Sequence, residues 1–304
     1  MKTKRLKLIA VSTAAFMAVS GATVAWAKLP PATNEFQTVN LKFNTKKLGK
    51  SKKGKVAQMT VTTGTGIGAP SQPNPDYSGV PDPAVRALVY FDKSIKTNLK
   101  GIPICDETAV QGLNTLAARA ACPTAIVGSG QAAVRIPNIS EGPNSAYNTG
   151  QATVNGKTIA GETQATVTAF KTTKAGKYDR LILFSRVGAT AVGSALIGTL
   201  KPAPKALKKK GYGTLLDVEI PPLALGAALT RFSLTVGGTS WPAYTEASPG
   251  PYTAKVSNSK AKNFIKASCP KRKLKLTSEF QFTTEGTPAP EVQLPATSTP
   301  FKCR

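Results

Sequence analysis

Apolar and polar residues alternate along most of this 304-residue chain, and this pattern limits the fold more than any other feature of the sequence. Two examples are ETQATVTAFK (162–171) and YDRLILFSRVG (178–188), which are separated by a short turn rich in Thr and Lys. Side chains two residues apart lie on the same face of a strand, so each segment predicts a strand with one buried face. About a dozen such segments, with turns roughly every 8 to 12 residues, predict an all-β fold, and more specifically a β-sandwich of jelly-roll type.

Turn signals between the segments support the same fold class. Asn155-Gly156 is a dipeptide favoured by the type I′ turn, so residues 151–159 are expected to form a hairpin. A lysine-rich turn at 45–55 separates two further alternating segments and predicts a second hairpin. Residues 64–83 are dense in Gly and Pro and are expected to form a long loop.

One segment, CDETAVQGLNTLAARAAC (105–122), is expected to be helical. Its Asp106 suits a helix N-terminus electrostatically, and Val110, Leu113 and Leu116 recur at helical spacing. Gly112 interrupts the pattern. The segment therefore predicts one or two short helical turns that a disulfide holds against the sheet.

The N-terminus has the form of a secretory signal peptide. Four basic residues precede an uncharged apolar stretch that ends in Ala25-Trp26-Ala27, which fits the small-residue rule of the signal peptidase. The alternative is a retained membrane anchor. We expect residues 1–27 to be removed and residues 28–304 to form a single secreted domain, extracellular or loosely associated with the cell wall. No later stretch has the apolar length of a transmembrane helix.

The four cysteines of an exported chain are expected to be oxidised. Three pairings are possible, and the sequence-local one joins Cys105 to Cys122 and Cys269 to Cys303. The second of these disulfides would close the C-terminal portion, residues 269–304. No C-x-x-C spacing occurs, which argues against a redox motif or a zinc site.

A strong positive charge indicates the kind of partner. The whole chain carries a formal charge of +25, and because four of its basic residues and no acidic ones lie in residues 1–27, the exported part carries +21. Such a chain attracts polyanions, for example an anionic cell-wall polymer or polysaccharide. The alternative is that the lysines only solvate the surface. No aromatic residues interleave with the lysine runs for base stacking, which argues against nucleic acid.

The chain contains no histidine, and this absence removes several kinds of chemistry. A Ser-His-Asp triad, a Cys-His dyad and histidine metal sites are all excluded. We expect no metal and no cofactor, and a non-enzymatic structural or binding protein of the cell envelope.

Two carboxylates are the remaining catalytic candidates. Asp217 and Glu219 stand two apart on a predicted strand, so they share a face at about 7 Å, a separation suited to acid and base work on a glycoside. The alternative is a solvated polar face. A carbohydrate-active enzyme that uses this pair is therefore the second functional hypothesis.

A loop rich in Pro and Gly holds the candidate ligand-binding aromatics. Trp241, Tyr244 and Tyr252 could form a platform for sugar rings, or they could cover one end of the core.

Several segments resemble a known group of proteins. VYFDKSIKTNLKGIPIC, ACPTAIVGSGQA, GYGTLLDVEIPPL and LTRFSLTVGG, with a last segment bounded by cysteines, are similar to uncharacterised secreted β-rich proteins of soil actinobacteria. The resemblance spans most of the exported chain and implies export, disulfides and a sandwich fold. The group has no established activity, so the resemblance implies no site.

The C-terminal segment EVQLPATSTPFKCR contains Leu294-Pro295-Ala296-Thr297, which is close to a cell-wall sorting signal. Ser298 stands where that signal needs glycine, and only six residues follow it. We therefore expect a short terminal strand that contains Val292 and Leu294 and ends at Pro295.

Overall fold

The structure is a computed structural model. It describes residues 35–45, 48–49, 54–67, 80–136, 150–188, 193–221, 223, 227–246, 254–271, 273–283, 292–295 and 297–303. The signal peptide predicted for residues 1–27 lies outside these ranges, as does Tyr252.

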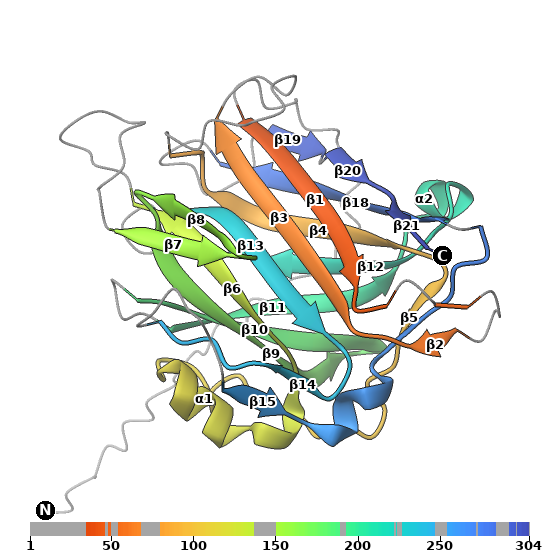
Figure 1. Ribbon diagram of the computed structural model, residues 1–304, viewed down its shortest axis with the longest axis horizontal. Coiled ribbons are helices and arrows are strands. Elements are labelled where there is room, and N and C mark those ends of the chain that lie inside the picture. Colours follow the sequence, from red (N-terminus) through yellow and green to blue (C-terminus); the bar gives the residue numbers. More distant parts are fainter. Residues whose placement is uncertain are drawn as a thin grey trace, which may run out of the picture.

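Twelve strands form one main sheet (Figure 1). In chain order they are β1 (Glu35–Phe43), β3 (Met59–Ile67), β4 (Ala84–Asp92), β6 (Ile126–Arg135), β9 (Thr163–Ala175), β10 (Tyr178–Val187), β11 (Gly193–Pro202), β12 (Tyr212–Glu219), β13 (Ala228–Val236), β18 (Leu276–Phe282), β19 (Val292–Pro295) and β20 (Thr297–Thr299). Their order across the sheet is β19-β18-β4-β12-β11-β10-β9-β6-β13-β3-β1-β20. Neighbouring strands are antiparallel, except for the parallel pair β1 and β20.

The sequence correctly predicts the all-β class, but the jelly-roll sandwich is not confirmed. A sandwich packs two separate sheets face to face. In the described part of the chain, the large sheet instead curves until it is nearly closed (Figure 1).

The C-terminal tail brings the two edges of the main sheet together. β19 pairs with β18 at one edge, and β20, which begins two residues after β19 ends, pairs with β1 at the other edge. Thr38 lies opposite Thr297 in the β1–β20 pair. The terminal strand predicted to end at Pro295 is confirmed, and the chain then continues into a second strand.

Shorter elements surround the main sheet. They are the three-stranded sheet of β2 (Lys55–Val56), β16 (Ile265–Ala267) and β5 (Ile95–Thr97), the pair β17 (Lys273–Leu274) and β21 (Phe301–Lys302), the pair β14 (Ser240–Pro242) and β15 (Lys255–Ser257), the hairpin β7 (Gln151–Val154) and β8 (Lys157–Ala160), the helices α1 (Thr115–Ala121) and α2 (Lys205–Lys209), and the 3₁₀ turns Pro123–Ala125 and Ser259–Asn263. The predicted Asn-Gly hairpin is confirmed, because Asn155 (φ 52°) and Gly156 (φ 78°) both have the positive φ of a type I′ turn. β3 extends to Ile67, so it takes the first residues of the expected loop 64–83.

The helical segment is present, but the helix begins later than the sequence suggests. Asn114 caps α1 by accepting a hydrogen bond from the Ala117 amide at 2.8 Å. Asp106 instead closes a preceding turn through the Thr108 amide. Gly112, with φ of 75°, separates that turn from the helix. Leu116, expected on the apolar face, is 63% exposed.

Both predicted disulfides are confirmed, Cys105 with Cys122 and Cys269 with Cys303. The first holds the α1 segment, and the Cys105 amide also donates to the carbonyl of Lys171 on β9. The second ties the C-terminal tail to the chain that leads into β17. Among the described residues, no helix combines the length and the apolar character needed to cross a membrane.

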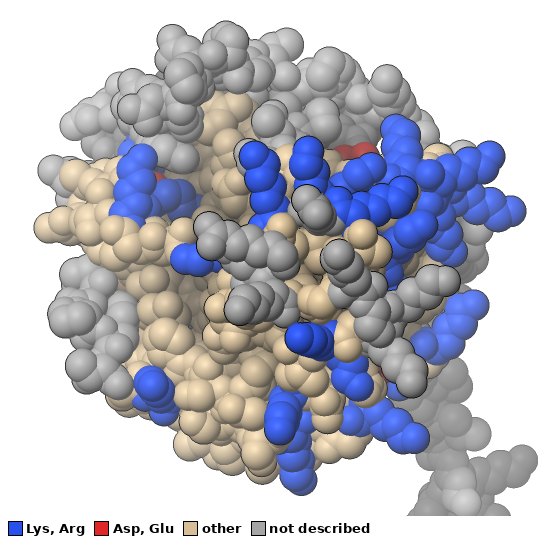
Figure 2. Space-filling view, turned by 45° about the vertical axis from the view of Figure 1, so that its right-hand side comes forward, with Lys and Arg blue, Asp and Glu red and all other residues tan. Residues whose placement is uncertain are grey.

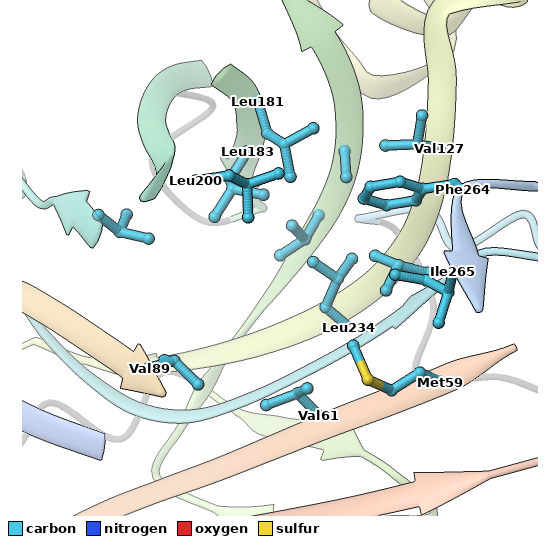
Figure 3. Packing of buried hydrophobic residues seen from close by; sticks show 14 of the residues in the cluster. Met59, Val61, Val89, Val127, Leu181, Leu183, Leu200, Leu234, Phe264 and Ile265 are labelled. Carbon is cyan, nitrogen blue, oxygen red and sulfur yellow. The ribbon is translucent and has the colours of Figure 1, made fainter. Parts of the chain in front are cut away.

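The core lies on both faces of the sheet. On β10, Leu181 and Leu183 point into the interior of the nearly closed sheet, where they face residues such as Val61 and Leu234 (Figure 3). Ile182 and Phe184 alternate with them and therefore face outward. All four of these side chains are at most 4% exposed, so the middle of β10 is buried on both faces.

Candidate functional site

The candidate catalytic residue Asp217 is held in an ion-pair cluster on the outer face of β12. Arg86 donates to its two carboxylate oxygens at 2.8 and 2.7 Å, and Lys201 Nζ donates at 2.7 Å. Asp217 is 5% exposed. Burial alone would raise the pKa of Asp217, but the hydrogen bonds from Arg86 and Lys201 outweigh burial and lower that pKa below its ordinary value.

Glu219 lies two residues along the same strand and is exposed. It stands opposite Arg86 in the β12–β4 pair, so the structure does bring both candidate carboxylates to one face, with an arginine beside them. A general acid in glycoside cleavage needs a raised pKa. The lowered pKa of Asp217 and its two cationic partners are instead typical of a structural ion pair.

The candidate aromatic platform is not assembled at the surface. Trp241 is 1% exposed, and its indole N–H donates to the carbonyl of Gly237 at 2.9 Å. Tyr244 is half-buried, and burial raises its pKa. These two positions fit the alternative in which the aromatics cover one end of the core.

A buried arginine that the sequence did not single out holds α1 on the sheet. Arg119 donates to the hydroxyl of Thr168 at 3.0 Å, to the carbonyl of Tyr244 at 2.9 Å and to the hydroxyl of Ser129 at 3.3 Å. Burial lowers the pKa of Arg119 to about 10. Since its guanidinium has partners on three different segments, Arg119 serves the packing of α1.

On the face drawn in Figure 2, lysines concentrate in one region, which we call the basic end. It lies where β4 leads into β5, where β11 leads into α2, and where the tail pairs with β17. Hydrogen bonds join its parts, because Lys275 Nζ donates to the carbonyl of Lys210 and the Lys93 amide donates to that of Gly211. The basic end comprises Lys93, Lys96, Lys205, Lys208, Lys209, Lys210, Lys266, Lys273, Lys275 and Lys302.

Two pairs of these lysines face each other directly across strands. Lys96 of β5 stands opposite Lys266 of β16, and Lys273 of β17 stands opposite Lys302 of β21. Like charges at opposite positions destabilise a strand pair. The facing lysine side chains therefore do not stabilise the pairing of their strands.

Carboxylates do not neutralise the basic end. Among the described residues, none of its ten lysines forms an ion pair. Asp92 lies nearby, but it is 8% exposed, and its oxygens accept the backbone amides of Ser94 at 2.8 Å and Lys275 at 3.1 Å. The basic end therefore presents its charge to the solvent.

The sequence did not predict this clustering, because the ten lysines come from segments as far apart as residues 93 and 302.

Within the described ranges, no group of three or more Cys, Asp or Glu side chains is placed to hold a metal ion. Comparison with protein-family models, with curated proteins and with solved structures found no match to this chain.

Proposed function

We propose that this chain is an exported, non-enzymatic binding protein of the cell envelope and that it holds an anionic polymer on its basic end. Two pairs of lysines that face each other across strands carry the proposal, Lys96 with Lys266 and Lys273 with Lys302. None of these four lysines forms an ion pair with a carboxylate of the described residues. A bound phosphate or carboxylate between each pair would remove a repulsion that the free protein bears.

A polymer suits this surface better than a small anion. The ten lysines extend over several elements, so one long chain of negative charges would contact many of them at once. Because the protein has no histidine, its charge hardly changes between about pH 5 and 8, and the attraction persists through that range.

An acidic cell-wall polymer or polysaccharide is favoured over nucleic acid as the partner. Binding of single-stranded nucleic acid relies on aromatic rings that stack on bases. Near α2, the rings of Tyr90 and Tyr212 pack edge to face against each other, with their centroids 6.5 Å apart. The signal peptide predicted for residues 1–27 also favours an extracellular partner.

The proposal is tested by sedimentation with isolated cell walls, before and after acid extraction of their anionic polymer. We expect binding to intact walls only. Raising salt from about 0.1 M to about 1 M shortens the screening length from about 10 Å to about 3 Å and should release the protein.

A matched pair of variants locates the site. In one, the facing lysines Lys96, Lys266, Lys273 and Lys302 are replaced by Gln. In the other, four exposed lysines outside the basic end are replaced, namely Lys100, Lys157, Lys255 and Lys260. Both lose the same charge, but only the first should lose at least tenfold in affinity. Equal losses would mean that net charge alone drives adhesion, and the basic end would then not be a site.

A further inference from the structure

The interior of the main sheet contains an apolar cavity of about 140 Å³. Its walls are apolar side chains, mostly aliphatic with four phenylalanines. Val61 of β3, Val89 of β4, Leu183 of β10 and Leu234 of β13 are among them and point toward one another in Figure 3. Protein interiors are packed nearly as densely as organic crystals, and few of their voids exceed a water molecule. A space several times the roughly 30 Å³ share of one water is therefore unusual.

The residues that line the cavity extend along β10. Leu181 and Val187 both line it, and they are six residues apart on β10. At about 3.3 Å per residue, this separation corresponds to roughly 20 Å along the strand. An extended, slender molecule would contact lining residues along this whole distance.

Among the described residues that line the cavity, the polar side chains are Ser and Thr, which contribute hydroxyls. No charged side chain is among the described residues that line it. Ser185 of β10 and Ser194 of β11 stand directly opposite each other, and both face the cavity. Neither hydroxyl is hydrogen-bonded to another described residue, so both are available to a ligand. They lie toward the end of the cavity where β10 ends and β11 begins.

From these features we infer that the interior binds a ligand with one unbranched hydrocarbon chain and an uncharged polar head group. The chain lies along the aliphatic walls. The head group, such as an alcohol, lies at Ser185 and Ser194, where one hydroxyl can donate to it and the other can accept from it. A carboxylate there would be buried without a cation, so an acid binds more weakly than the alcohol of the same length. This site is separate from the basic end, and neither proposal depends on the other.

Isothermal titration calorimetry of the wild-type protein with 1-hexanol, 1-octanol and 1-decanol tests the site without any variant. We expect saturable binding with one ligand per chain. The affinity should rise by about fourfold for each added methylene, which is the increment for burying a CH₂ group. At neutral pH, decanoate should bind at least tenfold more weakly than 1-decanol.

Filling part of the cavity should weaken the binding of 1-decanol. Ala132 of β6 and Ala87 of β4 line different walls, so Ala132→Leu and Ala87→Leu each occupy part of the channel. Each should lower the affinity for 1-decanol at least tenfold. Ala120→Leu adds the same side chain at an exposed position of α1 and should leave binding unchanged. Two filling variants are used so that the test still works if one of them does not fold. Circular dichroism checks the folding of each variant.

The head-group assignment has its own variant. Ser185→Ala combined with Ser194→Ala should lower the affinity for 1-decanol by roughly 25-fold, about fivefold for each of the two hydrogen bonds lost, and leave decane unaffected. The proposal is overturned if the wild type shows no saturable binding of 1-decanol or if both filling variants bind it as the wild type does. Equal binding of decanoate and 1-decanol would overturn the assignment of an uncharged head group.

Discussion

Arg231 and Glu162 form an ion pair that is almost entirely removed from solvent, since the two residues are 5% and 0% exposed. Arg231 also donates to the carbonyls of Ala152 at 2.8 Å and Lys157 at 2.6 Å, and the other oxygen of Glu162 accepts from Thr230 at 2.8 Å. One guanidinium therefore ties the β7–β8 hairpin to the main sheet.

Breaking this pair should be costly. Glu162→Gln leaves the Arg231 charge buried without its counter-ion, and we expect the free energy of unfolding to fall by about 3 kcal/mol or more. Asp179→Asn breaks the more exposed Lys174–Asp179 pair and should change the free energy of unfolding by less than about 1 kcal/mol. Denaturant unfolding of both variants measures the contrast. Similar small losses would mean that the buried pair is not formed in solution.

The Asp217 cluster should make stability depend on pH. Because the pKa of Asp217 is lowered in the folded protein, its contribution is fully present above its unfolded pKa of about 3.9 and is lost as the pH falls through the folded value. The difference in unfolding free energy between the wild type and Asp217→Asn should therefore be largest at neutral pH and shrink below about pH 4. Urea unfolding across this range measures it, and a constant difference would contradict the ion-pair assignment.

The disulfide between Cys269 and Cys303 should stabilise the tail that completes the main sheet. It spans 34 residues, and replacing both cysteines by Ser should lower the free energy of unfolding by about 4 kcal/mol in the chain-entropy model. The amides of residues 38–40, which pair with β20, should also exchange faster with solvent. Unchanged exchange there would show that β20 stays in place without the disulfide. The matched variant lacking Cys105 and Cys122 should leave these amides protected.

A close contact between two strands should make Gly130 intolerant of any side chain. A Cβ at this position of β6 would lie 2.1 Å from the backbone oxygen of Ser233 on β13. Gly130→Ala should therefore cost about 2 kcal/mol or more, because the backbone has to move. At Gly198 the nearest atom is the flexible end of Leu216 at 2.9 Å, so Gly198→Ala should cost less. Thermal unfolding compares the two, and equal costs would contradict the close strand approach.

Local signals in the sequence predict several local features of the structure correctly. The Asn155-Gly156 hairpin depends on two residues that accept positive φ, and the cysteine pairs join nearby parts of the chain. The start of α1 was placed too early because Asp106 is equally suited to cap a turn, and its side chain does so.

The candidate sites depended on facts that no local pattern carries. The spacing of Asp217 and Glu219 correctly predicts that they share one face of a strand. It cannot predict that Arg86, which is 131 residues from Asp217, lies beside them. Trp241 stands in a loop-like stretch, and only the packing around it decides that the ring is buried.

The sequence by itself determined the all-β class, because alternation along a strand directly reflects which face is buried. Only the tertiary structure decided that the strands form one nearly closed sheet, since the edges meet through pairing of residues 38–40 with 297–299. Pairing between distant segments likewise places Lys96 opposite Lys266 at the basic end. The pattern of residues within one strand does not determine which distant strand it pairs with, because that pairing depends on the whole chain.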